Sequence, residues 1–234
     1  MKQRFLFLTV LLSGFLFFQD LAAQRKPIKM GLKVSPNLSW MMPDSKHYAY
    51  NGVTGGTLVG LVSDFYFAEH YAFSTGFNFA FLNGKLQYGD WVIDNKDTIP
   101  GQMDRKYKFI YIDIPYMIKL ATREFGHFSF FGQIGFSTGF RISAKARDEF
   151  NPDDGSNSRS ENSDITGETT LLREAILFGL GVEYHLDEDT RIFVGVSYSN
   201  SLNNILTGTN ARYGQNEKAM LNFEIGRASC RERV

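Results

Sequence analysis

The sequence predicts an all-β protein, namely a transmembrane up-and-down antiparallel β-barrel of eight strands that follows an N-terminal signal peptide. Three observations lead to this prediction. The chain begins with the features of an export signal, apolar and polar residues then alternate with period two in several segments, and the connections between these segments are alternately short and long. Alternation gives each strand one apolar and one polar face, as a barrel wall requires.

The first 23 residues have the organisation of a secretory signal peptide. Lys2 and Arg4 precede an almost wholly apolar run from Phe5 to Phe18, and small residues end the segment at Ala23. The apolar run is shorter than the roughly 20 residues of a membrane-spanning helix. We therefore expect cleavage after Ala23. No second long apolar run follows, so a mature protein that sits in a membrane has to cross it with strands.

The length of residues 24–223 suits one domain, which we predict to be the barrel. The 22 Phe and 11 Tyr residues form a heavy aromatic load, as expected for strands that meet lipid. Lys and Arg together number 25, as do Asp and Glu, so the composition gives no reason to expect nucleic acid as a partner.

The C-terminal residues 224–234 break the alternation of the strand that leads into them. Residues 225–234 can be back-translated into a sequence that looks like the reverse complement of a common sequencing adapter. We therefore interpret residues 224–234 as an adapter artefact that replaces the end of the eighth strand. The alternative is a natural basic tail. Under our interpretation the single cysteine, Cys230, is not native, the natural strand continues with alternating apolar residues, and a chain with this end inserts poorly.

Eight segments alternate clearly enough to be predicted as strands. In the segment 71–81, for example, Phe77, Phe79 and Phe81 alternate with Asn78 and Ala80. The predicted strands are 28–40, 57–67, 71–81, 108–122, 128–142, 176–186, 191–199 and the interrupted 219–223.

The connections between these strands alternate in length. Residues 67–70, 123–126 and 187–189 are predicted tight turns, whereas the polar segments 41–56, 83–107, 145–171 and 202–217 are predicted long loops. In outer-membrane barrels the short turns face the periplasm and the long loops face outward. From a periplasmic N-terminus the first connection has to be a long outer loop, and in this sequence it is.

The face opposite the apolar residues carries Gly, Ser and Asn with scattered charges. We predict that these charges lie inside the barrel and pair with one another. The predicted interior charges are Lys33, Asp64, Asp113, Lys119, Arg141, Glu183, His185 and Arg191. A soluble β-sandwich or lipocalin-like barrel is the alternative, but its apolar core would then hold charges that cost several kcal/mol each if unpaired.

Aromatic residues gather at both ends of the predicted strands and predict girdles at the two membrane interfaces. The predicted girdle residues are Trp40, Phe79, Phe81, Phe140 and Tyr198 toward the long connections, and Phe65, Phe67, Tyr71, Phe128 and Tyr184 toward the short turns. A general tendency of strand ends to be aromatic would account for part of this pattern.

The sequence offers little that indicates catalysis. An eight-stranded barrel is just wide enough for its own side chains, which disfavours a general porin and leaves a proton or ion path as an alternative. We expect no cofactor and no metal, because neither a phosphate-binding glycine loop nor zinc or EF-hand spacing is present. An enzyme at the outer rim would need a histidine for acid–base catalysis on a long connection. Of the four histidines, only His47 lies on one, with Asp44 and Ser45 nearby.

Three segments resemble PorT-like outer-membrane β-barrel proteins, and the resemblance extends over most of residues 24–223. They are Gly31–Trp40, Asp64–Gly76 and Tyr111–Lys119, the last with the pattern Tyr-x-Asp-Ile-Pro. The resemblance implies an outer-membrane location and contact with outer-membrane lipid. It also raises the alternative of an accessory part of the type IX secretion and gliding machinery. Because Pro115 cannot donate to a strand ladder, we expect irregular pairing there.

Together these observations predict a non-enzymatic barrel of the cell outer membrane. Its long loops, or its periplasmic turns, would dock a partner, with a periplasmic or secretion-complex protein as the candidate. The accessory secretion role and a small enzyme at the outer rim are the two alternatives. The sequence does not indicate an oligomeric state.

Overall fold

The computed structural model describes residues 28–44, 47–94, 97–153, 158–187, 190–207 and 219–230. The predicted signal peptide, residues 1–23, lies outside the described residues. Within these ranges, no helix is long and apolar enough to cross a membrane.

The described residues form ten strands and one 3-10 helix, in keeping with the all-β prediction. In chain order these elements are β1 (Ile28–Pro43), β2 (Tyr48–Tyr50), β3 (Thr54–Ala68), β4 (Tyr71–Asp94), β5 (Asp97–Ala121), β6 (Phe128–Pro152), β7 (Arg159–Asp164), η2 (Thr166–Glu168), β8 (Leu172–His185), β9 (Arg191–Ser201) and β10 (Ala219–Cys230).

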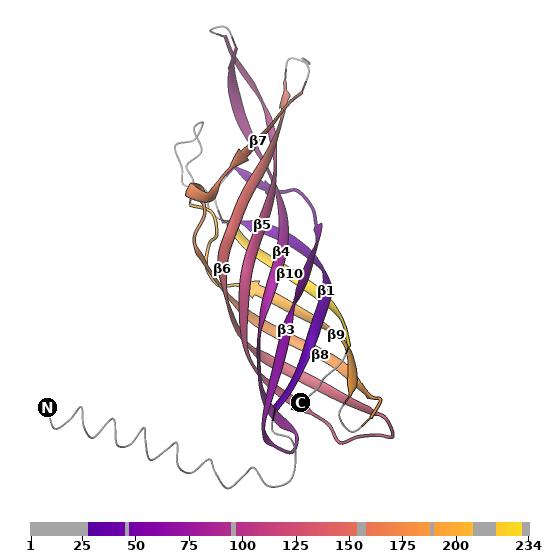
Figure 1. The fold of residues 1–234 in the computed structure, drawn as a ribbon. Coiled ribbons are helices and arrows are strands. Elements are labelled where there is room, and N and C mark those ends of the chain that lie inside the picture. The colour runs from indigo at the N-terminus through magenta and orange to yellow at the C-terminus, as the bar shows by residue number, and fades with distance from the viewer. Residues whose placement is uncertain are drawn as a thin grey trace, which may run out of the picture.

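Eight of the strands form the barrel wall (Figure 1). Going around the wall, the antiparallel order is β1, β3, β4, β5, β6, β8, β9 and β10, and β10 pairs in turn with β1. Successive wall strands are therefore neighbours, as in an up-and-down barrel, and the predicted fold class is confirmed. Every strand of the wall has a partner on both sides, which is what lipid requires of backbone polar groups.

The two ends of the barrel differ in their connections. At the turn end lie the short connections 69–70 and 122–127, and the described residues 186–187 and 190 of a third. At the loop end lie residues 44 and 47–53 with β2, the last described pair of the β4–β5 hairpin, residues 153 and 158–171 with β7 and η2, and residues 202–207. β1 begins at the turn end, where Ile28 is the cross-strand partner of Phe65.

The prediction of long loops at 83–107 and 145–171 is wrong in large part. The β4–β5 ladder continues to the pair Asp94–Asp97, and β6 stays paired with β5 as far as Pro152. The alternation rule missed these strands because most of their outward residues are polar. The ladder itself is held by backbone hydrogen bonds, which need no apolar face.

We call this extension the protruding sheet. It consists of residues 83–94, 97–108 and 143–152 of β4, β5 and β6, with β2 paired to β4 and β7 paired to β6 at its edges. Figure 1 shows β4, β5 and β6 reaching well past the other wall strands at the loop end.

Besides the register shift between Tyr66 and Ala68 next to the β3–β4 turn, two irregularities interrupt the wall. On the β4 side of β5, the pairs Thr75–Tyr116 and Asn78–Asp113 are formed but the positions between them, opposite Pro115, are not, so the predicted irregular pairing at Pro115 is confirmed. The second is a β-bulge at Ile142, where the β5–β6 register shifts. A bulge moves the following residues to the opposite face.

Strand β10 extends to Cys230 and pairs with β1 and β9 through residues that we interpret as an adapter artefact. A short segment can join a ladder through its backbone whatever its side chains are. The origin of residues 224–234 therefore stays a prediction, and residues 231–234 lie outside the described residues.

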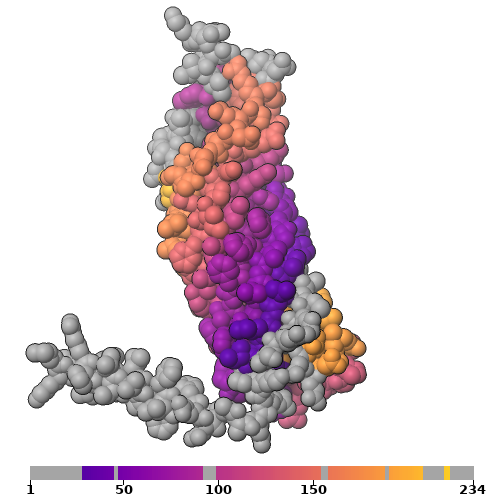
Figure 2. Space-filling view, in the orientation of Figure 1, coloured from indigo at the N-terminus to yellow at the C-terminus, as the bar shows by residue number. Residues whose placement is uncertain are grey.

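The outside of the wall is apolar. Exposed fractions reach 60% for Leu32, 68% for Leu180 and 56% for Val194. From Tyr71 to Phe81 on β4, ten steps of about 3.3 Å make roughly 33 Å of strand, which a tilt of about 40° reduces to roughly 25 Å across the membrane. In Figure 2 the strands on the near side form one uninterrupted wall.

Candidate functional site

The half of the barrel interior near the turn end holds a network of buried charges. Lys119 Nζ lies 2.5 Å from Asp64 Oδ2 and 2.5 Å from Glu183 Oε1. Arg191 also donates to Glu183, and its Nη1 lies 3.1 Å from the hydroxyl of Tyr66. Positive and negative groups thus alternate across β3, β5, β8 and β9. The mutual pairing offsets the cost of removing these charges from water.

A second buried cluster lies closer to the loop end and centres on Arg173, whose side chain is 1% exposed. Its Nη1 lies 3.7 Å from Asp113 Oδ1. The guanidinium also donates to Ser201 Oγ at 2.9 Å, to Ser199 Oγ at 2.8 Å and to the Leu221 carbonyl at 3.4 Å. One side chain therefore connects β5, β8, β9 and β10.

Sequence reasoning missed Arg173, because the predicted sixth strand began at Ile176. A signal was present. Arg173 continues the inward positions Ala175 and Leu177 with period two, and all three side chains are buried.

The predicted interior charges fall into four places. Asp64, Lys119, Glu183 and Arg191 meet in the first network. Lys33 and Asp113 are buried in the interior as well, and they interact electrostatically.

Arg141 and His185 do not join them. Half-buried Arg141 lies at the loop end, where it donates to Thr169 and to the Thr170 carbonyl. His185 lies at the turn end, with its Nε2 3.0 Å from Ser129 Oγ.

The residues predicted as girdles lie on the outward face, all of them exposed except half-buried Trp40. Trp40 and Tyr198 stack with ring centroids 6.2 Å apart near the loop-end limits of β1 and β9. Phe67 and Tyr71 stack at 6.3 Å beside the short β3–β4 turn. The remaining positions are Phe65, Phe128 and Tyr184 next to the turn end, and Phe79, Phe81 and Phe140 where β3 and β8 begin at the loop end.

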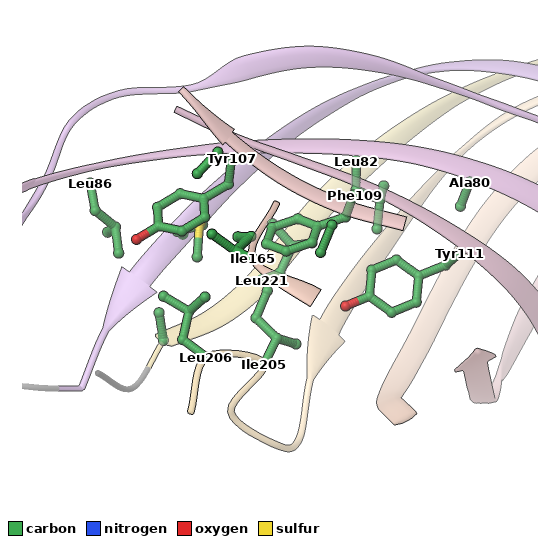
Figure 3. Packing of buried hydrophobic residues seen from close by; sticks show 14 of the residues in the cluster. Ala80, Leu82, Leu86, Tyr107, Phe109, Tyr111, Ile165, Ile205, Leu206 and Leu221 are labelled. Atoms are coloured by element: carbon green, nitrogen blue, oxygen red, sulfur yellow. The ribbon is translucent and has the colours of Figure 1, made fainter. Parts of the chain in front are cut away.

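At the loop end the interior is apolar, which the sequence analysis did not predict. The rings of Tyr107, Phe109 and Tyr111 line up along β5, with successive centroids 5.9 and 6.1 Å apart. Figure 3 shows Ile165, Ile205 and Leu206, which come from the loop-end connections, lying opposite these rings.

We call these side chains and those packed around them the apolar plug. Its members are Met41, Leu58, Ala80, Leu82, Leu86, Tyr107, Phe109, Tyr111, Ala144, Ala146, Ile165, Ile205, Leu206, Ala219 and Leu221. Backbone hydrogen bonds hold the two connections together, from Thr170 N to the Ile205 carbonyl and from Thr207 N to the Glu168 carbonyl, both 2.8–2.9 Å. The plug therefore fills the barrel at its loop end.

Two cavities lie at and near the turn end. The inner one, beside Lys119 and Phe131, has a volume of 30 Å³, which is room for a water molecule or two. The second, of 260 Å³, opens at the barrel mouth and is lined by residues of both signs, among them Lys29, Glu124 and Arg191. The residues that line these two cavities do not include any member of the apolar plug.

The described residues offer little support for a metal site or for the candidate rim site at His47. The described residues contain no group of three His, Cys, Asp or Glu side chains that could hold a metal ion. His47 is exposed in a left-handed backbone conformation with φ 74°, and Asp44 is exposed as well. Ser45, the third member of the candidate rim site, lies outside the described residues.

An eight-stranded wall with an apolar exterior and a filled interior that carries paired charges defines a small integral β-barrel protein of the outer-membrane type. The chain matches the family described as outer membrane protein beta-barrel domain over residues 19–207, and it belongs to that family. Membership implies the cell outer membrane as its location. No curated protein matches the chain.

Several solved outer-membrane barrels have a similar fold. Neisserial surface protein A shares 10% identity with a TM-score of 0.43, covering 87% of this chain and 97% of that one. Ail of Yersinia pestis, solved in complex with the heparin analogue sucrose octasulfate, shares 12% identity with a TM-score of 0.38, covering 88% and 99%. OprG from Pseudomonas aeruginosa shares 12% identity with a TM-score of 0.36, covering 88% and 94%.

Proposed function

We propose that this chain is a non-enzymatic outer-membrane barrel that docks a protein partner on its protruding sheet. In this proposal the N-terminus and the turn end face the periplasm, and the loop end with the protruding sheet faces outward. The observation that carries the proposal is the sheet itself. β4 and β5 continue as a paired hairpin from Asn83–Lys108 to Asp94–Asp97, about 36 Å at 3.3 Å per residue.

The barrel interior supports a docking role over a transport role. Buried charge pairs occupy the half near the turn end, and the apolar plug occupies the loop end. A filled interior suits a barrel that anchors a recognition surface, because the wall then serves as a rigid base.

Side-chain contacts hold the protruding sheet in one arrangement. Arg105 makes a two-point contact with Asp148, with distances of 2.6 and 2.9 Å, and reaches Glu168 at 3.5 Å. Burial lowers the pKa of Arg105, but the hydrogen bond to Asp148 and nearby Tyr88 and Tyr107 raise it by more, so its pKa lies above its ordinary value. A preformed surface loses less entropy when a partner binds, which favours affinity.

The test is recovery of partners from native membranes with a shortened hairpin. Replacing residues 88–103 with Asn-Gly joins Gln87 to Asp104, which already are cross-strand partners, through a two-residue turn. We expect the shortened chain to keep the heat-modifiable gel migration of a folded barrel and to lose the co-purifying protein.

The matched control changes the opposite end of the barrel, with Arg123→Ala and Glu124→Ala in the 122–127 connection. We expect this control to keep the partner. Loss of the partner in the control but not in the shortened chain would place docking at the turn end and overturn the proposal. Recovery of the chain as a soluble periplasmic protein would contradict the proposal as well, because docking on the barrel requires that the barrel lies in the outer membrane.

A PorT-like accessory role in secretion or gliding is the second candidate. The motifs at Gly31–Trp40, Asp64–Gly76 and Tyr111–Lys119 favour it. Crosslinking in intact cells should then recover a secretion component, and a crosslinked set without any such component would count against the role.

The non-enzymatic assignment is tested separately through His47, the only residue that favours a rim enzyme. We expect His47→Ala to change neither stability nor any loop-dependent phenotype.

A further inference from the structure

Two rows of basic side chains cross the protruding sheet. In one row Lys85, Lys106 and Arg147 are direct cross-strand neighbours, and in the next Lys108 is the partner of Lys145. We call these five side chains the basic patch. Like charges directly opposite each other destabilise a sheet, so the arrangement calls for a compensating anion.

The basic patch lies on the outward face of the barrel wall. On β4 and β5 the inward residues Leu86, Tyr107 and Phe109 are buried, so Lys85, Lys106 and Lys108 project to the other side. On β6 the bulge at Ile142 reverses the alternation, which puts exposed Lys145 and Arg147 on the same outward face.

The basic patch starts where the apolar band stops. Phe81 and Ile110 form the cross-strand pair at which the continuous apolar band ends, and the pairs Asn83–Lys108 and Lys85–Lys106 follow next along the strands. Two residues of strand cover about 7 Å before the tilt is considered. With a strand tilt of about 40°, the row of Lys108 lies roughly 5 Å and the row of Lys85 roughly 10 Å beyond the apolar edge, so the basic patch begins within the layer of lipid headgroups.

Protein groups satisfy little of this charge. Lys106 Nζ lies 3.4 Å from Glu149, and Arg147 Nε lies 3.2 Å from Ser160 Oγ. Lys85, Lys108 and Lys145 form no salt bridge with any residue that the structure describes. Carboxylates of the same face occur at its margins, since Asp104 and Glu149 form the next row outward and Asp164 is the β7 partner of Lys145.

The surface is also hollowed here. A depression of 540 Å³ is lined by Lys108, Lys145 and Arg147 together with Asn162 and Asp164 of β7. Ammonium and guanidinium groups beside amide donors form a suitable environment for phosphate oxygens.

We propose that the basic patch binds the phosphate groups of a membrane lipid whose acyl chains pack on the apolar wall below it. With the loop end outward, that lipid is a phosphorylated glycolipid of the outer leaflet. Charge complementarity and the position directly above the apolar band both support a lipid headgroup over a soluble anion. The inference goes beyond partner docking. It rests on the proposed orientation, with the loop end outward, but it can hold whether or not a protein partner exists.

The test measures how a phosphorylated lipid shifts the midpoint of heat-modifiable migration. Full-length protein from outer membranes is held in a zwitterionic detergent, and diphosphorylated lipid A or phosphatidylcholine is added. We expect lipid A to raise the midpoint and phosphatidylcholine to leave it unchanged. The variant K108Q/K145Q should bind lipid A about thirtyfold more weakly, because each Lys near an anionic surface contributes about a fivefold gain in affinity.

Two control variants make the result specific. R123Q/R159Q removes the same number of positive charges away from the basic patch and should bind lipid A like the wild type. Arg123 lies at the turn end. Arg159 lies on β7, and its cross-strand partner Phe150 is buried on the inward face. K108R/K145R keeps the charge and should retain binding. Without lipid, K108Q/K145Q should be at least as heat-stable as the wild type, because the opposed charges are gone.

Three outcomes would overturn the proposal. The first is an equal loss of lipid A binding in K108Q/K145Q and R123Q/R159Q. The second is a midpoint shift by inorganic phosphate as large as that by lipid A at the same phosphate concentration, which would indicate a general anion effect. The third is a shift by heparin but not by lipid A, which would indicate an acidic glycan as the ligand.

Discussion

Replacing Arg173 by Met should be one of the most destabilising single changes in this barrel. The substitution removes the cation 3.7 Å from Asp113, together with the hydrogen bonds to Ser199, Ser201 and the Leu221 carbonyl. Asp113, which is 3% exposed, would be left buried without that cation. Breaking a buried pair in this way costs about 3–5 kcal/mol, so we expect a loss of that size in the free energy of unfolding.

A double-mutant cycle separates the ion pair from the other contacts of Arg173. Asp113→Asn removes the charge that Arg173→Met leaves behind. We therefore expect the double variant to be more stable, by at least about 1 kcal/mol, than the sum of the two single effects predicts. Urea unfolding in lipid vesicles, followed by the fluorescence of Trp40 and Trp91, measures each corner of the cycle.

Arg159→Met is the matched control, since Arg159 is an exposed arginine of β7. It should change the free energy of unfolding by no more than about 0.5 kcal/mol. The reasoning fails if Arg173→Met costs less than about 1 kcal/mol, or if the two single effects simply add. Either result would mean that the ion pair of Arg173 and Asp113 adds nothing to the free energy of unfolding beyond the packing of the two side chains.

Three further predictions concern the remaining parts of the barrel. Lys119→Met leaves both Asp64 and Glu183 without their shared lysine and should cost about 3–5 kcal/mol in the same unfolding assay; a cost no larger than that of the Arg159 control would refute the network. Leu206→Asp puts a charge into the apolar plug, so limited proteolysis should cut residues 202–207 faster while the heat-modifiable migration of the barrel persists. Phe136→Arg places a cation on the exposed lipid face and should cost about 2–4 kcal/mol in vesicles; a negligible cost in the vesicle unfolding assay would contradict the placement of this face in lipid.

The alternation of the sequence determined the barrel wall. Along β5, outward Ile112 and Ile118 and inward Asp113 and Lys119 could be assigned from period two alone, and burial places them on these faces. This works because the lipid side of the wall has to be apolar at every strand, so each strand carries the full signal within its own residues.

The partners of the inward charges could not be read from the sequence. Lys119 contacts Asp64 and Glu183, which are 55 and 64 residues away along the chain. The relative register of neighbouring strands sets which inward residues share a level of the barrel. That register depends on turns and bulges, such as the one at Ile142, whose effects accumulate from strand to strand.

The sequence by itself thus determined the fold class, the number of wall strands and which face of each strand meets lipid. Only the tertiary structure decided that residues 83–107 continue the β4–β5 hairpin, that Ile165, Ile205 and Leu206 close the interior at the loop end, and that five cations gather just above the apolar band. The physical reason is the range of the interactions. Burial against lipid acts on every residue of a strand independently. These three features arise instead from contacts between separate segments, and the pattern within one segment does not show which other segment it contacts.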